Sequence, residues 1–112
     1  MSKNYREYLK HIAIECDFIA SSSKDLSFDD FFDDEILKRA IVRSLEIIGE
    51  ATKKVDVDQK LKYPDIAWKS MAGMRDRLIH DYMGVNYLIV WDVVKTKIPE
   101  LQLQIHSILL QG

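Results

Sequence analysis

Apolar residues recur every three or four positions along nearly the whole chain, and this spacing constrains the fold more than any other feature of the sequence. One such stripe comprises Leu37, Ile41, Leu45, Ile48 and Val55. It predicts a helix over about residues 28–55 that forms the centre of the fold. Ser27 and Asp30 have the spacing of a capping box at the start of this helix.

Similar stripes predict further helices over about residues 5–20, 65–82, 87–97 and 99–110, with Gly73 as a possible weak point of the second. The polar segment 55–64 ends in a proline and is expected to form a loop. Asn86 is a candidate N-cap, and Pro99 is expected to end one helix and to lie in the first turn of the next. No alternating strand pattern competes. The sequence therefore predicts an all-α fold, an antiparallel bundle of four to five helices.

Length and composition favour one folded domain over residues 1–112, with 47% apolar and 30% charged residues. Cys16 is the single cysteine, which excludes an intramolecular disulfide and favours a reducing, cytoplasmic setting. The longest apolar run, 87–91, is too short to span a bilayer, and the first residues lack the apolar core of a secretion signal. A net charge of −2 argues against coating nucleic acid by bulk attraction, but it allows a nuclease with a local cationic groove.

The stretch RDRLIHDY, residues 75–82, contains the residues best suited to chemistry. On a helix over 65–82, Arg75 would lie in the middle of an apolar arc, within about 60° of Trp68, Met71, Ala72, Leu78 and Ile79. Because a guanidinium is costly to bury alone, it must pair with an acid, reach solvent or line a cleft that admits an anion. Glu46 and Glu50 are candidate partners, so a purely structural ion pair between helices is one interpretation.

The neighbours of Arg75 favour a second, catalytic interpretation. His80 can move protons near neutral pH, and Asp76, one helical turn earlier, could orient its ring. Tyr82 adds a phenol on the side of the arginine. Together these groups offer phosphate binding and acid–base chemistry without a metal or other cofactor. The set suits RNA cleavage in which the ribose 2′-hydroxyl attacks its own phosphate.

The other chemically notable residues have structural explanations. The acidic run 29–35 lies where the dipole at the start of a helix favours negative charge, which we prefer to a metal site. Residues expected to serve packing or to lie at the surface are His11, Cys16, Gly49, Trp68, Trp91 and His106. An RNA-contacting rim could come from Lys10, Lys24, Arg39, Arg43, Lys69 and Arg77, although scattered cations usually only aid solubility.

Arg75, His80 and Tyr82 form the pattern R-x4-H-x-Y, and the chain resembles HEPN-domain proteins, specifically the HepT-like toxins of prokaryotic toxin–antitoxin pairs. The resemblance extends over residues 43–55, 63–86 and 90–101, in the same order as in that family.

This resemblance implies a helical homodimer in which two motifs meet in a shared cleft and cleave RNA without a metal. Arg75 would hold the scissile phosphate, and His80 would act as general acid or base. It further implies a partner, a minimal nucleotidyltransferase antitoxin of the type VII systems, that silences the toxin by transferring AMP to Tyr82. The residue after the motif arginine is commonly Asn in the family, whereas this chain has Asp76, whose charge lowers the attraction of the cleft for phosphate.

The sequence thus leaves three hypotheses: a toxin ribonuclease, a non-enzymatic helical module that binds a nucleotidyltransferase, and a bundle in which Arg75 is only an ion pair. The first two overlap, since both predict a homodimer and the same protein partner.

Overall fold

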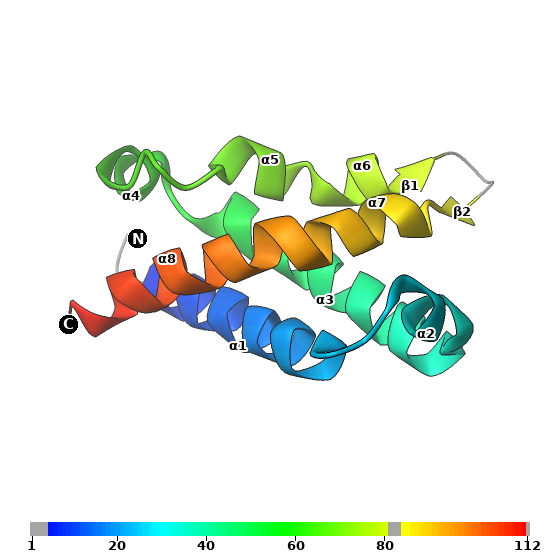
Figure 1. The fold of residues 1–112 in the computed structure, drawn as a ribbon. Helices are drawn as coiled ribbons and strands as arrows, with labels where there is room; N and C mark the ends of the chain where they lie inside the picture. The colour runs from blue at the N-terminus through cyan, green and yellow to red at the C-terminus, as the bar shows by residue number, and fades with distance from the viewer. Residues whose placement is uncertain (1–4, 81–83, 112) are drawn as a thin grey trace.

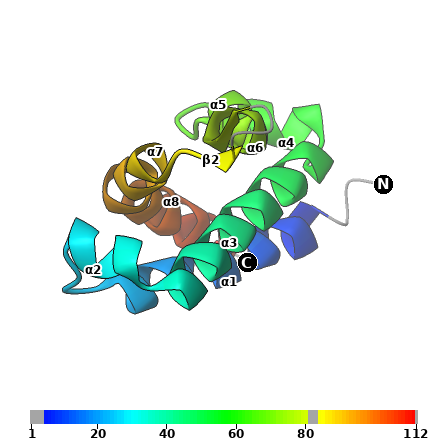
Figure 2. The same ribbon diagram turned by 90° about the vertical axis from the view of Figure 1, so that its right-hand side faces the viewer.

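The computed structural model describes residues 5–80 and 84–111, which form a helical bundle (Figure 1). Its elements are α1 (Tyr5–Ser23), α2 (Phe28–Asp33), α3 (Glu35–Lys54), α4 (Val57–Lys62), α5 (Trp68–Ala72), α6 (Met74–Leu78), β1 (Ile79–His80), β2 (Gly84–Val85), α7 (Tyr87–Asp92), the π-helical turn η3 (Val93–Lys97) and α8 (Ile98–Leu110). α3 packs on α1 along one side and on α5 and α6 along another, as Figure 2 also shows. The prediction of an all-α bundle is confirmed.

The apolar stripes read from the sequence face a common core. Ile41, Leu45 and Ile48 of α3 are completely buried, and so are Cys16 and Ile19 of α1. Burial raises the pKa of the Cys16 thiol to about 12, with smaller contributions from the nearby carboxylates of Asp17 and Glu15. Cys16 is therefore an inert core residue, as expected.

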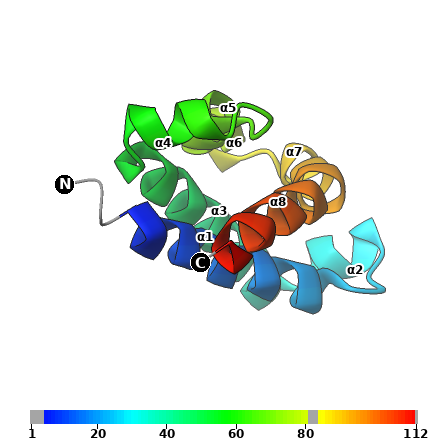
Figure 3. The same ribbon diagram turned by 90° about the vertical axis from the view of Figure 1, so that its left-hand side faces the viewer.

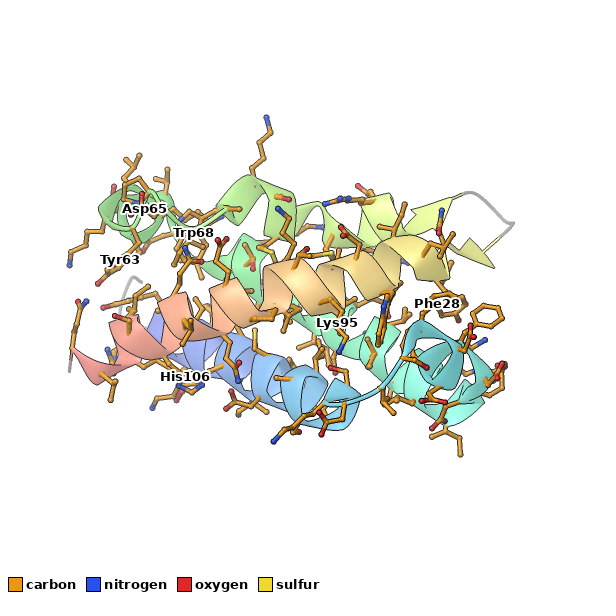
Figure 4. The ribbon with its side chains drawn as sticks, viewed as in Figure 1. Phe28, Tyr63, Asp65, Trp68, Lys95 and His106 are labelled. Carbon is orange, nitrogen blue, oxygen red and sulfur yellow. The ribbon has the colours of Figure 1, made fainter. Side chains whose placement is uncertain are left out.

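α1 and α8 lie side by side and antiparallel (Figure 3). Near one end Arg6 donates a hydrogen bond to the Leu109 carbonyl (3.0 Å). Midway, His106 Nε2 lies 2.8 Å from Asp17 Oδ1, which also accepts from Gln102 (Figure 4). Partial burial raises the pKa of Asp17, but the hydrogen bonds from Gln102 and His106 outweigh it, and the net shift is downward. His106 is thus a surface residue, as predicted.

The helix predicted over about residues 28–55 is interrupted, and this prediction was wrong in length. Ser27 caps the first part as expected, by accepting from the Asp30 amide. Asp34 then adopts an extended conformation and caps α3 by accepting from the Leu37 amide at 2.9 Å. The interruption turns α2 back toward α7, where Phe31 is completely buried and its ring stacks on Trp91 with centroids 5.0 Å apart.

Lys38 joins α2, α3 and α7 in a way that the sequence did not reveal. Its side chain is only 6% exposed and its ammonium lies 2.9 Å from Glu35. The same ammonium lies 4.1 Å from the ring centroid of Phe32 and 4.6 Å from that of Tyr87. Two aromatic faces and one carboxylate thus compensate a cation that would otherwise be costly to bury.

The segment 55–64, predicted to be a loop, contains the short helix α4. Asp56 caps it by accepting from the Gln59 amide. Trp68 anchors the chain after α4, because its indole donates to the carbonyls of Lys60 (3.1 Å) and Tyr63 (2.9 Å). Trp68 and Tyr63 are labelled in Figure 4. Trp68 is 9% exposed, so its predicted role as a core residue is confirmed.

Pro99 lies in the first turn of α8, as predicted, but it does not end the helical segment before it. α7, η3 and α8 follow one another without a break and form one continuous rod (Figure 1). In a regular α-helix the proline ring would clash with the carbonyl four residues earlier. One backbone hydrogen bond would also be lost, because proline has no N–H. Here the turn before Pro99 is π-helical, with the Ile98 amide donating to Val93 five residues back, so the chain passes the proline without ending the helix. Asn86 caps the start of this rod, as predicted, by accepting from the Leu88 and Ile89 amides.

Candidate functional site

The predicted helix over about residues 65–82 is broken, and this changes the setting of Arg75. Gly73 separates α5 from α6, and α6 ends at Leu78. Met74 and Leu78 are 1% and 0% exposed and anchor α6 to the core, while Arg75, Asp76 and Arg77 face solvent. The prediction that Arg75 lies in the middle of an apolar arc was therefore wrong, because the two short helices do not share one continuous wheel. Of the alternatives that the sequence left open, Arg75 reaches solvent.

Arg75 nevertheless pairs with one of its expected partners. Its Nε lies 3.6 Å from Oε2 of Glu46 on α3, and the Arg75 side chain remains 63% exposed. The other carboxylate oxygen, Oε1, lies 3.7 Å from Nη1 of Arg43. The Arg75–Glu46 ion pair predicted from the sequence is thus present, but it lies at the surface and is not a buried lock between helices.

Close packing of α5 and α6 on α3 brings Arg75 within reach of Glu46. Gly49 lies on α3 against α5, and a Cβ atom at this position would lie 3.2 Å from the Met71 carbonyl oxygen. Such a contact is tighter than most side chains tolerate, so the glycine permits the approach. The prediction that Gly49 serves packing and not phosphate binding is consistent with this position.

The motif continues from α6 into a two-stranded ladder. Ile79 pairs with Val85 and His80 with Gly84, in antiparallel register, and the Asn86 amide donates to the Leu78 carbonyl at 3.0 Å. Gly84 has φ +97°, a conformation that favours glycine. The His80 backbone is thereby held between the end of α6 and the start of α7.

This ladder changes the relation between Asp76 and His80. Asp76 and His80 do not share a helix, so the expectation that Asp76 supports the imidazole from one turn away loses its helical basis. The imidazole of His80 and the whole of Tyr82 lie outside the described residues. Their roles stay predictions from the sequence.

Two hollows on the surface bear on the site. An open hollow of about 680 Å³ lies over α4 and α5 and is bordered by Trp68 and by Lys69, a candidate for the RNA-contacting rim. Neither Arg75 nor Asp76 is among its described lining residues. A second, of about 270 Å³, lies between α1 and α3 and is lined by Arg43 together with Tyr8, His11 and Lys54. The sequence placed Arg43 only among scattered cations. Its position one turn before Glu46 on the same helix was the available signal for a closer relation to the site.

The residues that the structure describes contain no group of three or more His, Cys, Asp and Glu side chains placed to hold a metal ion. Within that same part of the chain, no helix is long and apolar enough to cross a membrane.

Comparison with known proteins shows what this chain is similar to. It is 50% identical over 107 residues to "Putative RNase TTE0752" of Caldanaerobacter subterraneus subsp. tengcongensis, with 96% of each chain covered. It is 41% identical to "Putative RNase MJ0125" of Methanocaldococcus jannaschii, covering 96% of this chain and 92% of that one. It is also 41% identical to "Probable ribonuclease HepT" of Thermococcus cleftensis, covering 91% and 93%. No solved structure gives a significant match. The family model described as "Ribonuclease HepT-like" matches residues 8–108, and the chain therefore belongs to the ribonuclease HepT-like family.

Proposed function

We propose that this protein is a metal-independent endoribonuclease and the toxin of a toxin–antitoxin pair. Membership of the ribonuclease HepT-like family and the names of its relatives support the reaction class. The structural observation that carries the proposal is the state of Arg75. Its ion pair with Glu46 uses Nε, and with 63% of the side chain exposed the guanidinium keeps donors for a phosphate.

In the proposed reaction the 2′-hydroxyl of a ribose attacks the adjacent phosphorus while the bond to the 5′-oxygen of the next nucleotide breaks. His80 removes the proton from the 2′-hydroxyl or donates one to the departing 5′-oxygen. Arg75 stabilises the negative charge that develops on the phosphate oxygens. The products are a 2′,3′-cyclic phosphate and a free 5′-hydroxyl, and these steps require no metal.

We further propose that the protein works as a homodimer in which the two motifs share a cleft. The partner is a nucleotidyltransferase antitoxin that transfers AMP to the Tyr82 hydroxyl. The adduct would add bulk and a negatively charged phosphodiester to the proposed cleft. Both effects would oppose the binding of an RNA backbone.

Cleavage of RNA by the purified protein in the presence of EDTA tests the nuclease. We expect products that end in 2′,3′-cyclic phosphate, and loss of cleavage in His80→Ala with an unchanged circular dichroism spectrum. His106→Ala is the matched control, because His106 is a surface histidine on α8 outside the motif. Cleavage by His80→Ala at the parent rate would refute the role of His80, and cleavage that stops with EDTA would refute metal independence.

Intact mass after co-expression with a candidate nucleotidyltransferase tests the modification. We expect a gain of one AMP on the parent and none on Tyr82→Phe, whereas the control Tyr87→Phe, in α7, is modified like the parent. A gain of AMP on a protein that never cuts RNA would support the non-enzymatic interaction module instead. Modification of Tyr82→Phe would refute the assignment to Tyr82.

A further inference from the structure

Glu46 holds two arginines that come from different parts of the chain. Its Oε2 faces Nε of Arg75 on α6 at 3.6 Å, and its Oε1 faces Nη1 of Arg43 on α3 at 3.7 Å. Each carboxylate oxygen thus pairs with one arginine, and the two guanidiniums lie on either side of the Glu46 carboxylate. The three groups together keep one unit of positive charge.

The two arginines and the glutamate differ in exposure. Glu46 is 23% exposed, whereas the side chains of Arg43 and Arg75 are 68% and 63% exposed. The carboxylate therefore lies beneath two cations that face solvent. Each cation uses one nitrogen toward Glu46, and a guanidinium has five donors, so both keep donors for a ligand outside the protein. A phosphate is the ligand that this geometry and charge suit best.

The hollow of about 270 Å³ continues the site on the far side of Arg43. Lys54 lines it and carries positive charge, Glu50 lines it and opposes that charge, and His11 and Tyr8 offer aromatic rings. A chain of phosphates bound at Arg75 that continued past Arg43 would reach a depression with room for part of a nucleotide and with a ring against which a base could lie.

We propose that Arg43 is a second phosphate-binding residue of the RNA site. Arg75 holds the scissile phosphate, and Arg43, held beside it by Glu46, binds a neighbouring phosphate of the same strand as that strand passes toward the hollow. Glu46 is a positioning residue, which acts through the two arginines. This inference rests on the proposed ribonuclease function and describes the path of the RNA strand over the surface of α3.

The chain offers a matched control for Arg43 in Arg39, which the sequence also counted among the possible rim cations but which does not line the hollow. Arg39 lies one turn earlier on α3, is 80% exposed, and also pairs with a glutamate of its own helix, Glu35, at 3.7 Å. A substitution at Arg39 therefore removes the same charge from the same helix. Only Arg43 shares its carboxylate with Arg75.

Binding is measured by fluorescence anisotropy with a single-stranded RNA oligonucleotide at several salt concentrations, in a His80→Ala background so that the RNA stays intact. For each phosphate contact on a single strand, the logarithm of the binding constant falls with the logarithm of the salt concentration with a slope of about −0.7. We expect Arg43→Gln to weaken binding several-fold and to reduce this slope by about 0.7, and Arg39→Gln to leave the slope unchanged. Equal effects of the two substitutions would overturn the proposal.

The positioning role of Glu46 has a separate signature. Glu46→Gln removes a negative charge from the site but also releases both arginines, so we expect a lower KM together with a lower kcat. A residue needed only for stability would not lower KM. An unchanged kcat in a folded Glu46→Gln protein would overturn the positioning role.

Two measurements separate this inference from its premise. If the parent protein neither binds nor cuts RNA, the proposed function itself fails. If the parent cuts RNA and Arg43→Gln behaves like Arg39→Gln, only the role of Arg43 fails. By light scattering, both variants should have the same oligomeric state as the parent. If Arg43→Gln dissociates and loses RNA binding together with its oligomeric state, a direct contact between Arg43 and phosphate is also overturned.

Discussion

The ion pair between Arg75 and Glu46 should contribute little to the stability of the fold, and a double-mutant cycle measures how much. The nitrogen and oxygen are 3.6 Å apart, but Arg75 is 63% exposed and water screens the pair. Exposed ion pairs of this kind contribute about 0.2–1 kcal/mol, whereas removing one partner of a buried pair costs about 3–5 kcal/mol. The exposure of Arg75 places this pair in the first class.

The cycle consists of Arg75→Ala, Glu46→Gln and the double variant, each unfolded in urea and followed by far-ultraviolet circular dichroism. We expect a coupling free energy below about 1 kcal/mol. Domains of this size have unfolding free energies of roughly 5–15 kcal/mol, so every variant should remain folded at room temperature. Because each kcal/mol corresponds to roughly 4–8 °C in Tm, loss of a pair worth about 0.2–1 kcal/mol lowers Tm by roughly 1–8 °C.

A second cycle between Arg43 and Glu46 is the control, because this pair lies within one helix and should give about 0.3–0.5 kcal/mol. A coupling of 3 kcal/mol or more between Arg75 and Glu46 would refute the reasoning. Arg75 would then be a structural residue, and loss of nuclease activity in Arg75→Ala could no longer be assigned to chemistry.

Three further predictions follow from burial and charge. Phe31→Ala should lower the unfolding free energy by about 3–5 kcal/mol in urea titrations, because Phe31 is completely buried. The control Phe32→Ala, at a position that is 44% exposed, should lower it by roughly 1 kcal/mol. Equal losses would contradict the conclusion that Phe31 anchors α2. Asp76→Asn removes an exposed negative charge beside Arg75 and should tighten RNA binding at low salt; unchanged affinity would show that this charge does not face the RNA. Cys16, with a pKa of about 12, should resist iodoacetamide at pH 8 in the folded protein and react only after unfolding; labelling of the native protein would contradict its burial.

The sequence was sufficient for the helical class and for the residues that face the core. The stripe on α3 predicted buried residues such as Ile41, Leu45 and Ile48, and all three are completely buried. The caps at Ser27 and Asn86 were also predicted correctly. These features depend on local spacing and on side chains that bond to the nearest backbone amides, so a single stretch of sequence contains the necessary information.

Periodicity alone did not reveal where the helices are interrupted. Asp34 and Gly73 each lie within a stretch of helical spacing, yet α2 separates from α3 and α5 from α6 at these residues. Of the two, Gly73 was marked as a possible weak point, because glycine is a poor helix former, and Asp34 was not. α2 turns because Phe31 stacks on Trp91, which lies far along the chain. At Pro99 the sequence predicted the end of a helix where there is none, because the π-helical turn before the proline keeps the rod continuous. Contacts distant in sequence and small adjustments of the backbone decided these three points.

At the candidate site, too, some features followed from the sequence and others only from the tertiary structure. The residue types and the R-x4-H-x-Y spacing of Arg75, His80 and Tyr82 were fixed by the sequence, and so was the family, which the comparison confirmed. That Arg75 faces solvent, and that Glu46 holds both Arg75 and Arg43, was decided only by the packing of α6 against α3. A helical wheel assumes one unbroken axis, and a break at Gly73 lets Met74 and Leu78 enter the core while the arginine between them faces outward.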